Sequence, residues 1–266
     1  MDGLEDNIVG NLFTQNGEDN GYNPEDFVQE INVGDMVPTF RISVANDDGG
    51  IPGSLFACTV WNGAKCIASH FAKYSDLVQG RNIVEFGAAS ALPSLVALHF
   101  GAKLAVMTAN IQRNQTLLGN GRHEVCGHLW GSDTARLLGC LDKSFVTTAK
   151  SSGAGPESND VLIETKFDIA VVAECLWLHH LHEDLLKSID SCLTRNGKAF
   201  VSFAHHVPGH EQNDLSFFAK AKKLYGFDAV HLDTLATPHV FSAGLVVEQY
   251  LKSNSCQIQQ QLAIIV

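Results

Sequence analysis

Apolar positions follow a helical period in one part of the chain and form short continuous runs in others. Val60, Ala64, Ile67, Ala68 and Phe71 are spaced so that they share one face of an amphipathic helix. Later apolar runs predict strands, and longer periodic segments predict helices. The predicted strands span 82–86, 103–108, 123–130, 167–173, 198–203, 228–232 and 257–266, and the later helices open at Leu92 and span 182–193 and 214–225.

This alternation of strands and helices is typical of an α/β protein with a doubly wound, mostly parallel sheet. Ligands of such sheets bind beyond the carboxyl ends of the strands. We therefore expect functional residues directly after the strands that end at positions 86, 108, 173 and 203.

Residues 1–50 are polar and carry little periodicity, which predicts an irregular N-terminal extension before a single domain over residues 51–266. Two pieces of the extension differ from the rest. They span 27–33 and 39–44, and in the second piece Phe40, Ile42 and Val44 alternate as in a strand.

The charge balance narrows the classes of partner. The chain has 18 Lys and Arg against 29 Asp and Glu, a formal net charge of −11, and 45% of its residues are hydrophobic. Such a composition excludes a mainly disordered chain and disfavours binding to nucleic acid, whose phosphates the acidic field repels. No run of 18 apolar residues occurs, so we expect no membrane contact.

The cysteines and the acidic start of the chain predict a cytoplasmic protein. The first residues lack the cationic stretch of a signal peptide. Seven cysteines without a C-x-x-C pair are typical of reduced thiols, and their spacing does not fit a zinc site. We therefore expect no metal, and the oligomeric state stays open.

The segment Glu85–Ser94 is the first candidate for a ligand site. It places Gly87 and several small residues directly after a predicted strand, with Pro93 in the first turn of a helix. A turn of small residues allows close approach of the backbone to a ligand, and the following helix offers free amides. The spacing is not that of the dinucleotide-binding fingerprint, because Gly87 is the one glycine of the turn.

The residues Asn82–Ser94 resemble motif I of class I methyltransferases that depend on S-adenosylmethionine (SAM). The similarity is greatest to fungal members of the group that includes nicotinamide N-methyltransferase-like and elongation-factor lysine methyltransferases. Further matches lie at 60–64, 129–131 and 173–179. The resemblance covers residues 55 to 232 and implies a seven-stranded sheet, SAM as the cofactor, and an amine of a protein or a small nucleophile as the acceptor.

The resemblance also implies which residues contact SAM. Glu85, Gly87 and Ala88 would line its methionine and ribose side. The other implied contacts are Trp61 in the N-terminal helix, Trp130 near the adenine, and Ala173 and Glu174 where the wall after strand four meets SAM and substrate. Without the resemblance, both tryptophans are equally explained as aromatic core packing.

Two positions depart from the family pattern. Relatives usually end strand two with an acid that binds the ribose hydroxyls, whereas this chain has Ala109 and Asn110. Upstream, a histidine- and tryptophan-containing pattern of the family is replaced by residues 53–58. Asn110 would serve as a neutral acceptor in place of the missing carboxylate.

Histidines gather after two of the predicted strands and are the candidates for catalysis. His179 follows strand four and matches histidines of the family, while His205 and His206 follow strand five. Histidine at such an edge can act as a general base. The alternative is that all three are exposed loop residues.

The missing acid also leaves a second function open. The same fold could carry out a cyclisation or isomerisation of a small metabolite, with His205 or His206 as the polar catalyst. A third possibility is a binding module without catalysis. The sequence does not identify the acceptor, because acceptor pockets of this fold come from variable loops.

Replacement of Ala109 with Asp should tighten SAM binding. A hydrogen bond to a charged group contributes about 1.5–3 kcal/mol, so a restored carboxylate should lower the dissociation constant about tenfold or more. Calorimetric titration of SAM into the wild type and Ala109→Asp measures the effect. Unchanged or weaker SAM affinity in a well-folded Ala109→Asp would contradict the proposed ribose position.

Overall fold

A seven-stranded sheet with the order β5-β4-β3-β6-β7-β9-β8 forms the centre of the computed structural model. The structure describes residues 28–35, 37–44, 58–106, 114–141, 165–206, 209–238 and 257–266. Five strands run parallel, and β9 joins β7 and β8 in antiparallel pairs. The strands are β3 (Asn82–Phe86), β4 (Leu104–Val106), β5 (Arg122–Glu124), β6 (Phe167–Ala173), β7 (Leu193–Phe203), β8 (Ala229–Pro238) and β9 (Gln257–Ile265).

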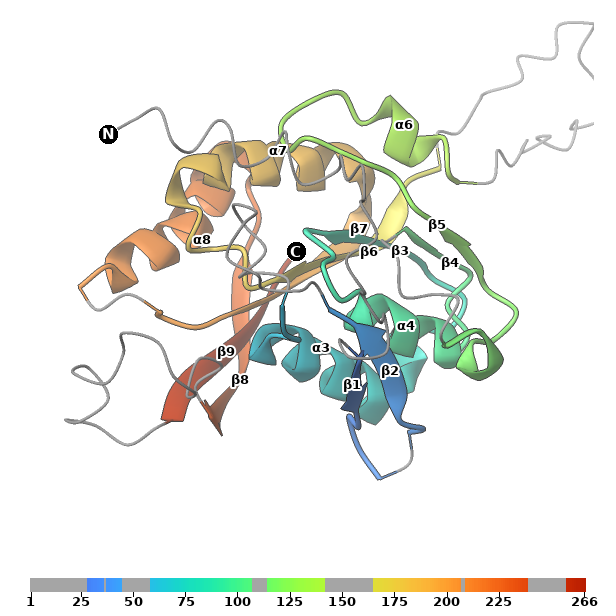
Figure 1. Cartoon of the computed structure of the whole chain (residues 1–266). Coiled ribbons are helices and arrows are strands. Elements are labelled where there is room, and N and C mark those ends of the chain that lie inside the picture. The colour runs from blue at the N-terminus through green and yellow to red at the C-terminus, as the bar shows by residue number, and fades with distance from the viewer. Residues whose placement is uncertain are drawn as a thin grey trace, which may run out of the picture.

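Helices cover both faces of this sheet (Figure 1). On one face, α3 (Asn62–Lys73) and α4 (Leu92–His99) pack over a core cluster that includes Ile67, Phe71 and Leu95. On the other face, α7 (His182–Cys192) and α8 (Glu211–Tyr225) cover a second cluster. The short helices are α6 (Ala135–Leu138), η2 (Ser75–Leu77), η3 (Gln115–Leu117) and η4 (His179–Leu181). This arrangement confirms the doubly wound α/β fold.

The expected elements differ from the observed ones mainly at their ends. The strand expected over 123–130 is wrong in length, because β5 ends at Glu124, opposite Val106 of its partner β4. Beyond that point Val125 and Leu129 are exposed, so the apolar residues there do not form a buried strand. The strand expected over 198–203 begins earlier, at Leu193, which pairs with Phe167 of β6.

The strand expected over residues 39–44 is β2 (Phe40–Ser43), which pairs with β1 (Val28–Ile31) in a two-stranded sheet. Phe40 and Ile42 are fully buried in the cluster on the α3 and α4 face. Asn114 fixes the hairpin, because its side chain accepts a hydrogen bond from the amide of Arg41 and donates one to its carbonyl, both at 2.8 Å. The hairpin therefore contributes side chains to the same core as the central sheet.

The turn after β3 places α4 at the carboxyl end of the sheet. Gly87 has φ +70°, and Ala91 has φ 56° directly before α4, so the chain reverses within five residues. Pro93 occupies the first turn of α4, where the missing amide hydrogen costs no helical hydrogen bond.

In the part of the chain that the structure describes, no helix is both long and apolar enough to cross a membrane.

Candidate functional site

The carboxyl ends of β3, β6 and β7 meet at one edge of the sheet, and most of the expected site residues lie there. Glu85 is the fourth residue of β3, and its side chain is buried. Its Oε2 accepts hydrogen bonds from the Ser94 amide at 3.2 Å and from Ser94 Oγ at 2.5 Å. This contact joins β3 to the first turn of α4 and fixes the loop between them.

The environment of Glu85 opposes its ionisation. Burial raises the pKa of this carboxyl group from 4.5 to about 7, although both hydrogen bonds from Ser94 act in the other direction. Glu85 therefore changes charge near neutral pH, next to the turn that forms the candidate ligand site.

Trp130 and Cys175 flank the turn at Gly87. A Cβ atom on Gly87 would lie 3.0 Å from Cys175 Sγ and 3.5 Å from Trp130 Cζ2. The Cys175 thiol is buried, and burial together with the nearby Glu174 and Glu85 raises its pKa to about 12. The turn thus has a glycine where a side chain would fill the space beside an indole ring.

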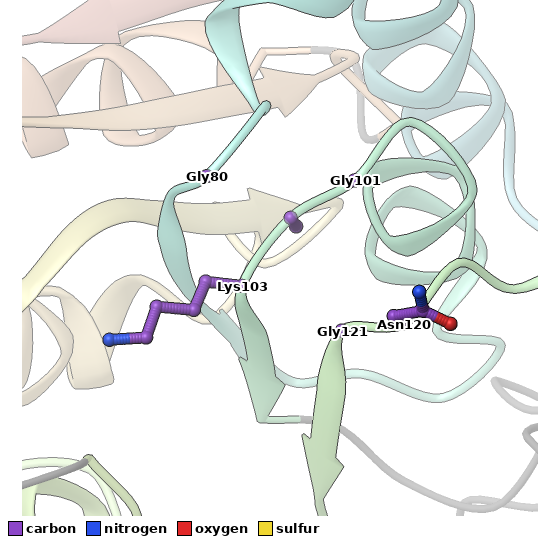
Figure 2. A pocket seen from close by; sticks show the side chains of 6 residues that line it. Gly80, Gly101, Lys103, Asn120 and Gly121 are labelled. Carbon is purple, nitrogen blue, oxygen red and sulfur yellow. The ribbon is translucent and has the colours of Figure 1, made fainter.

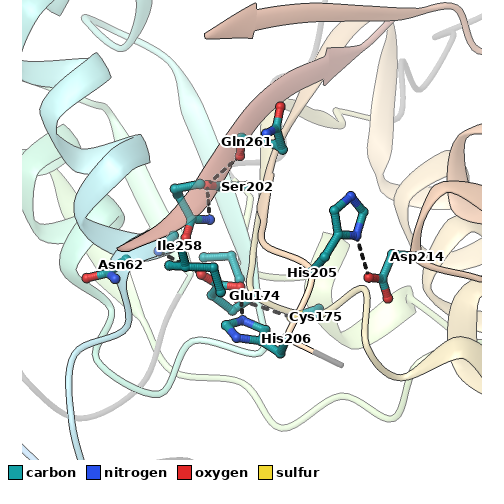
Figure 3. Close-up of polar contacts among 12 residues, drawn as sticks. Asn62, Glu174, Cys175, Ser202, His205, His206, Asp214, Ile258 and Gln261 are labelled. Carbon is teal, nitrogen blue, oxygen red and sulfur yellow. Dashed lines mark hydrogen bonds and ion pairs between the residues drawn. The ribbon is translucent and has the colours of Figure 1, made fainter. Parts of the chain in front are cut away.

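Glu174 connects three elements at the same edge (Figure 3). It follows β6 with φ 57°, and its amide donates to the Ser202 carbonyl of β7 at 2.8 Å. Its Oε1 accepts a hydrogen bond from the amide of Gly63 in α3, and its Oε2 accepts one from His206 Nε2, both at 3.0 Å. The carboxylate is buried, and each of its two oxygens accepts a hydrogen bond from a protein group, as a buried polar group requires.

Trp61, directly before α3, contacts the same histidine that bonds Glu174. Its ring lies edge-on to the ring of His206, with 5.4 Å between the ring centroids. The next residue, Asn62, donates to Thr237 Oγ1 of β8 at 3.0 Å. Trp61, Glu174 and His206 therefore form one contact group, which we call the Glu174 group.

His205 and His179 contact a different acid. His205 Nδ1 lies 2.8 Å from Asp214 Oδ2, and His179 Nε2 lies 2.6 Å from Asp214 Oδ1. Asp214 lies in the first turn of α8 and its side chain is 5% exposed. Figure 3 shows that His205 and His206 point away from each other, although they are neighbours in the sequence.

The structure thus divides the expected site residues into groups. Glu85, Gly87 and Trp130 lie at the turn after β3, whereas His206 contacts Trp61 and Glu174.

The remaining expected residues belong to neither group. Ala88 packs on the cluster of the α3 and α4 face. Ala173 is the last residue of β6, and its carbonyl accepts a weak hydrogen bond from Cys175 Sγ at 3.4 Å. Ala109 and Asn110 lie outside the described residues.

Sequence reasoning did not assign a role to Gly63 or Asp214. Gly63 is the second residue after Trp61, in a segment that resembles the family, and a Cβ at Gly63 would lie 2.7 Å from Glu174 Cγ. Asp214 carries no motif, and its position as an acid in the first turn of a helix indicates only a favourable interaction with the helix dipole.

A pocket of about 420 Å³ lies at the opposite edge of the sheet. It is lined by residues that precede β3, β4 and β5, among them Gly80, Lys103 and Gly121 (Figure 2). This edge carries the amino ends of the strands, away from the residues described above. Over the ranges that the structure describes, no group of three or more His, Cys, Asp or Glu side chains is arranged to hold a metal ion.

Curated relatives of the chain are fungal methyltransferases. The protein N-terminal and lysine N-methyltransferase EFM7 of Candida glabrata is 35% identical over 184 residues, which are 65% of this chain and 64% of that protein. The Candida albicans protein of the same name is 32% identical over 203 residues, 70% of this chain and 71% of that protein. The chain belongs to this methyltransferase family. It spans slightly less than two thirds of the first relative.

Two further comparisons concern family models and solved structures. No family model matches the sequence. A solved structure described as a candidate SAM-dependent methyltransferase from Streptococcus mutans superimposes with a TM-score of 0.52 and 14% identity, covering 92% of this chain and 56% of that one. This similarity shows the Rossmann-like methyltransferase fold. None of these relatives supports the cyclisation or isomerisation alternative.

Replacement of Gly87 with Ala should weaken SAM binding in this family member more than backbone strain explains. Gly80 is a matched control, because it has the same φ of +70° but nothing within 4 Å of an added Cβ. A positive φ at alanine costs about 1–2 kcal/mol in either variant. Only Gly87→Ala also places a Cβ against Cys175 and Trp130, so its SAM dissociation constant should rise at least about tenfold. Calorimetry on both folded variants measures this difference. Equal SAM affinities of Gly87→Ala and Gly80→Ala would show that the turn at Gly87 has only a structural role.

Replacement of Glu85 with Gln should flatten the dependence of stability on pH. Between pH 4.5 and about 7 the folded state binds more protons at Glu85 than the unfolded chain does. The free energy of unfolding therefore falls as the pH rises through this window, by on the order of 3 kcal/mol from this group. Glu85→Gln keeps an acceptor for Ser94 but cannot ionise.

Urea unfolding of the wild type and Glu85→Gln from pH 4 to pH 8 measures the expected difference. The exposed Glu183, which pairs with Lys220 at 3.5 Å, provides the control Glu183→Gln. Parallel pH profiles of the wild type and Glu85→Gln would show that burial does not alter the ionisation of Glu85.

Proposed function

We propose that this chain transfers the methyl group of SAM to an amine of a protein, with SAM held along the carboxyl ends of β3 and β6. The observation that carries the proposal is the Glu174 group beside the turn at Gly87. It places an imidazole that can act as a base near a turn of small residues between a strand and a helix.

The residues present fit SAM at this edge. A Cβ at position 87 would crowd Cys175 Sγ at 3.0 Å and lie 3.5 Å from Trp130 Cζ2, so glycine lets the backbone of the turn pass close to both side chains. Gly87 and Trp130 would hold the cofactor at the turn, and Ala173 and Glu174 would form the wall toward the acceptor. When bound, SAM supplies an electrophilic methyl group on a sulfonium sulfur.

The chemical task left to the protein is to deprotonate and orient the acceptor. A lysine amine has an unperturbed pKa of about 10.4 and an N-terminal amine one of about 8, so both reach the site largely as cations. An ammonium group has no lone pair with which to attack a methyl group. A base beside the acceptor therefore increases the reactive fraction.

His206 is the proposed base. A carboxylate can only accept hydrogen bonds, so the contact with Glu174 favours the tautomer of His206 that carries its proton on Nε2. In the proposed reaction the imidazole ring takes up the acceptor proton and becomes an imidazolium. Glu174 holds the ring in this tautomer and stabilises the imidazolium that forms, while Trp61 limits rotation of the ring.

The acceptor class follows from the relatives and from charge. The Candida proteins named above are methyltransferases for protein N-termini and lysine. A net charge of −11 attracts a basic protein surface and disfavours nucleic acid. We place the reaction in the cytoplasm, in line with cysteines that remain free thiols throughout the described ranges.

The first experiment is a calorimetric SAM titration followed by a methyl-transfer assay on a synthetic peptide with a free N-terminus and an internal lysine. Peptides with an acetylated N-terminus or with lysine replaced by arginine assign the methylated amine. SAM binding without transfer to any of the peptides, or to a basic protein extract, would contradict the proposed activity.

Substitution of His206 with Ala should slow methyl transfer strongly without loss of SAM. Removal of a general base typically costs about 10²–10⁴ in rate. Single-turnover rates of the wild type and His206→Ala at one fixed pH, with SAM affinity measured by calorimetry, give the size of this loss.

The exposed His231 of β8 provides the control His231→Ala, which should behave as the wild type. Rates within about twofold of wild type for His206→Ala would contradict a role of His206 in the reaction.

A further inference from the structure

Two adjacent histidines leave β7 in opposite directions, and each contacts a buried carboxylate. His206 donates to Glu174 at 3.0 Å and His205 donates to Asp214 at 2.8 Å. The side chains of the two acids are 6% and 5% exposed. The peptide unit between the two histidines is therefore held from both sides (Figure 3).

Asp214 uses both of its oxygens for imidazoles from different strand exits. His179 comes from the segment after β6, and His205 comes from the segment after β7. Asp214 itself belongs to the first turn of α8, where its amide donates to the His210 carbonyl at 3.2 Å. One carboxylate thus ties the exits of two neighbouring strands to the start of a helix.

We propose that Asp214 is a positioning residue, which acts through His205 to hold the imidazole of His206 against Glu174 and Trp61. The role in catalysis rests on the function proposed above, whereas the positioning is a property of the protein alone. Neither Asp214 nor His205 touches the acceptor in this proposal.

The strength and direction of the Asp214 contacts suit this role. Hydrogen bonds to an ionised carboxylate are roughly twice as strong as neutral ones and keep a defined geometry. Asp214 is buried, so it is shielded from water that would compete for its oxygens. Displacement of the His205 ring would break its bond to Asp214, and a shift of the His205 backbone would be transmitted to His206 through one peptide unit.

A purely structural alternative exists, because an acid in the first turn of α8 also stabilises the helix through its dipole. Glu211 lies in the same turn and accepts a hydrogen bond from the Gly209 amide at 3.0 Å. Glu211→Gln removes a first-turn charge without removing an imidazole contact. It is the matched control for Asp214→Asn.

The first test needs no acceptor. Nuclear magnetic resonance measures the contact between the His206 and Trp61 rings, whose centroids lie 5.4 Å apart, and the solvent exchange of the His206 Nε2 proton. His205→Ala and Asp214→Asn should weaken the ring contact at least about twofold and speed the exchange about tenfold. His205→Asn should restore both, because its amide nitrogen can donate to Asp214 in place of Nδ1.

Wild-type signals in a folded His205→Ala would overturn the proposal, as would equal changes in Glu211→Gln. If Asp214→Asn does not fold, the His205→Ala and His205→Asn pair decides by itself. A wild type that methylates no peptide would contradict the proposed function while leaving this measurement valid.

The second test links the positioning to the reaction through a double-mutant cycle. His205→Ala should lower the single-turnover rate about tenfold, with SAM affinity within about twofold of wild type. In the His206→Ala background the same substitution should have almost no further effect, because its target is gone. Additive losses in the double variant would show that His205 and Asp214 act independently of His206.

Discussion

The buried carboxylate of Glu174 is the constraint on which the arrangement of the site depends. A buried charge is costly unless its oxygens are satisfied, and here the partners come from α3 and from the segment after β7. Glu174 itself adopts φ 57°, a conformation that non-glycine residues rarely take. The bonds to Gly63 and His206 offset this strain and align three elements at one edge.

Gly63 shows how closely the surrounding chain fits this carboxylate. Its amide donates to Glu174 Oε1, and a Cβ at the same position would lie 2.9 Å from that oxygen. A side chain at position 63 would therefore displace the acid from both of its partners. The small residue after Trp61 and Asn62 is thus required by close packing, rather than by its own backbone angle.

Glu85, Glu174 and Asp214 are acids at one edge of the sheet with different partners. Glu85 contacts a serine and is pushed toward its neutral form by burial, whereas Glu174 and Asp214 accept hydrogen bonds from histidines. The two acids that contact histidines therefore lie at the exits of β6 and β7. The proposed function assigns that side to the acceptor amine and the turn after β3 to the cofactor.

The sequence by itself determined the order of strands and helices along the chain, the small-residue turn at Gly87 and the edge of the sheet at which most of the candidate residues gather. These features depend on local periodicity and on residues close together in the chain, which is why they could be predicted. The start of β7 could not be predicted in this way, because it lies at Leu193, opposite the first residue of its partner strand β6.

Only the tertiary structure decided which histidine meets which acid. His206 and Glu174 are 32 residues apart, and His179 and Asp214 are 35 residues apart. His205 and His206 look equivalent in the sequence, yet the direction in which each side chain leaves the strand gives them different partners. Such pairings follow from the packing of α8 and the strand exits against each other, which no local pattern encodes.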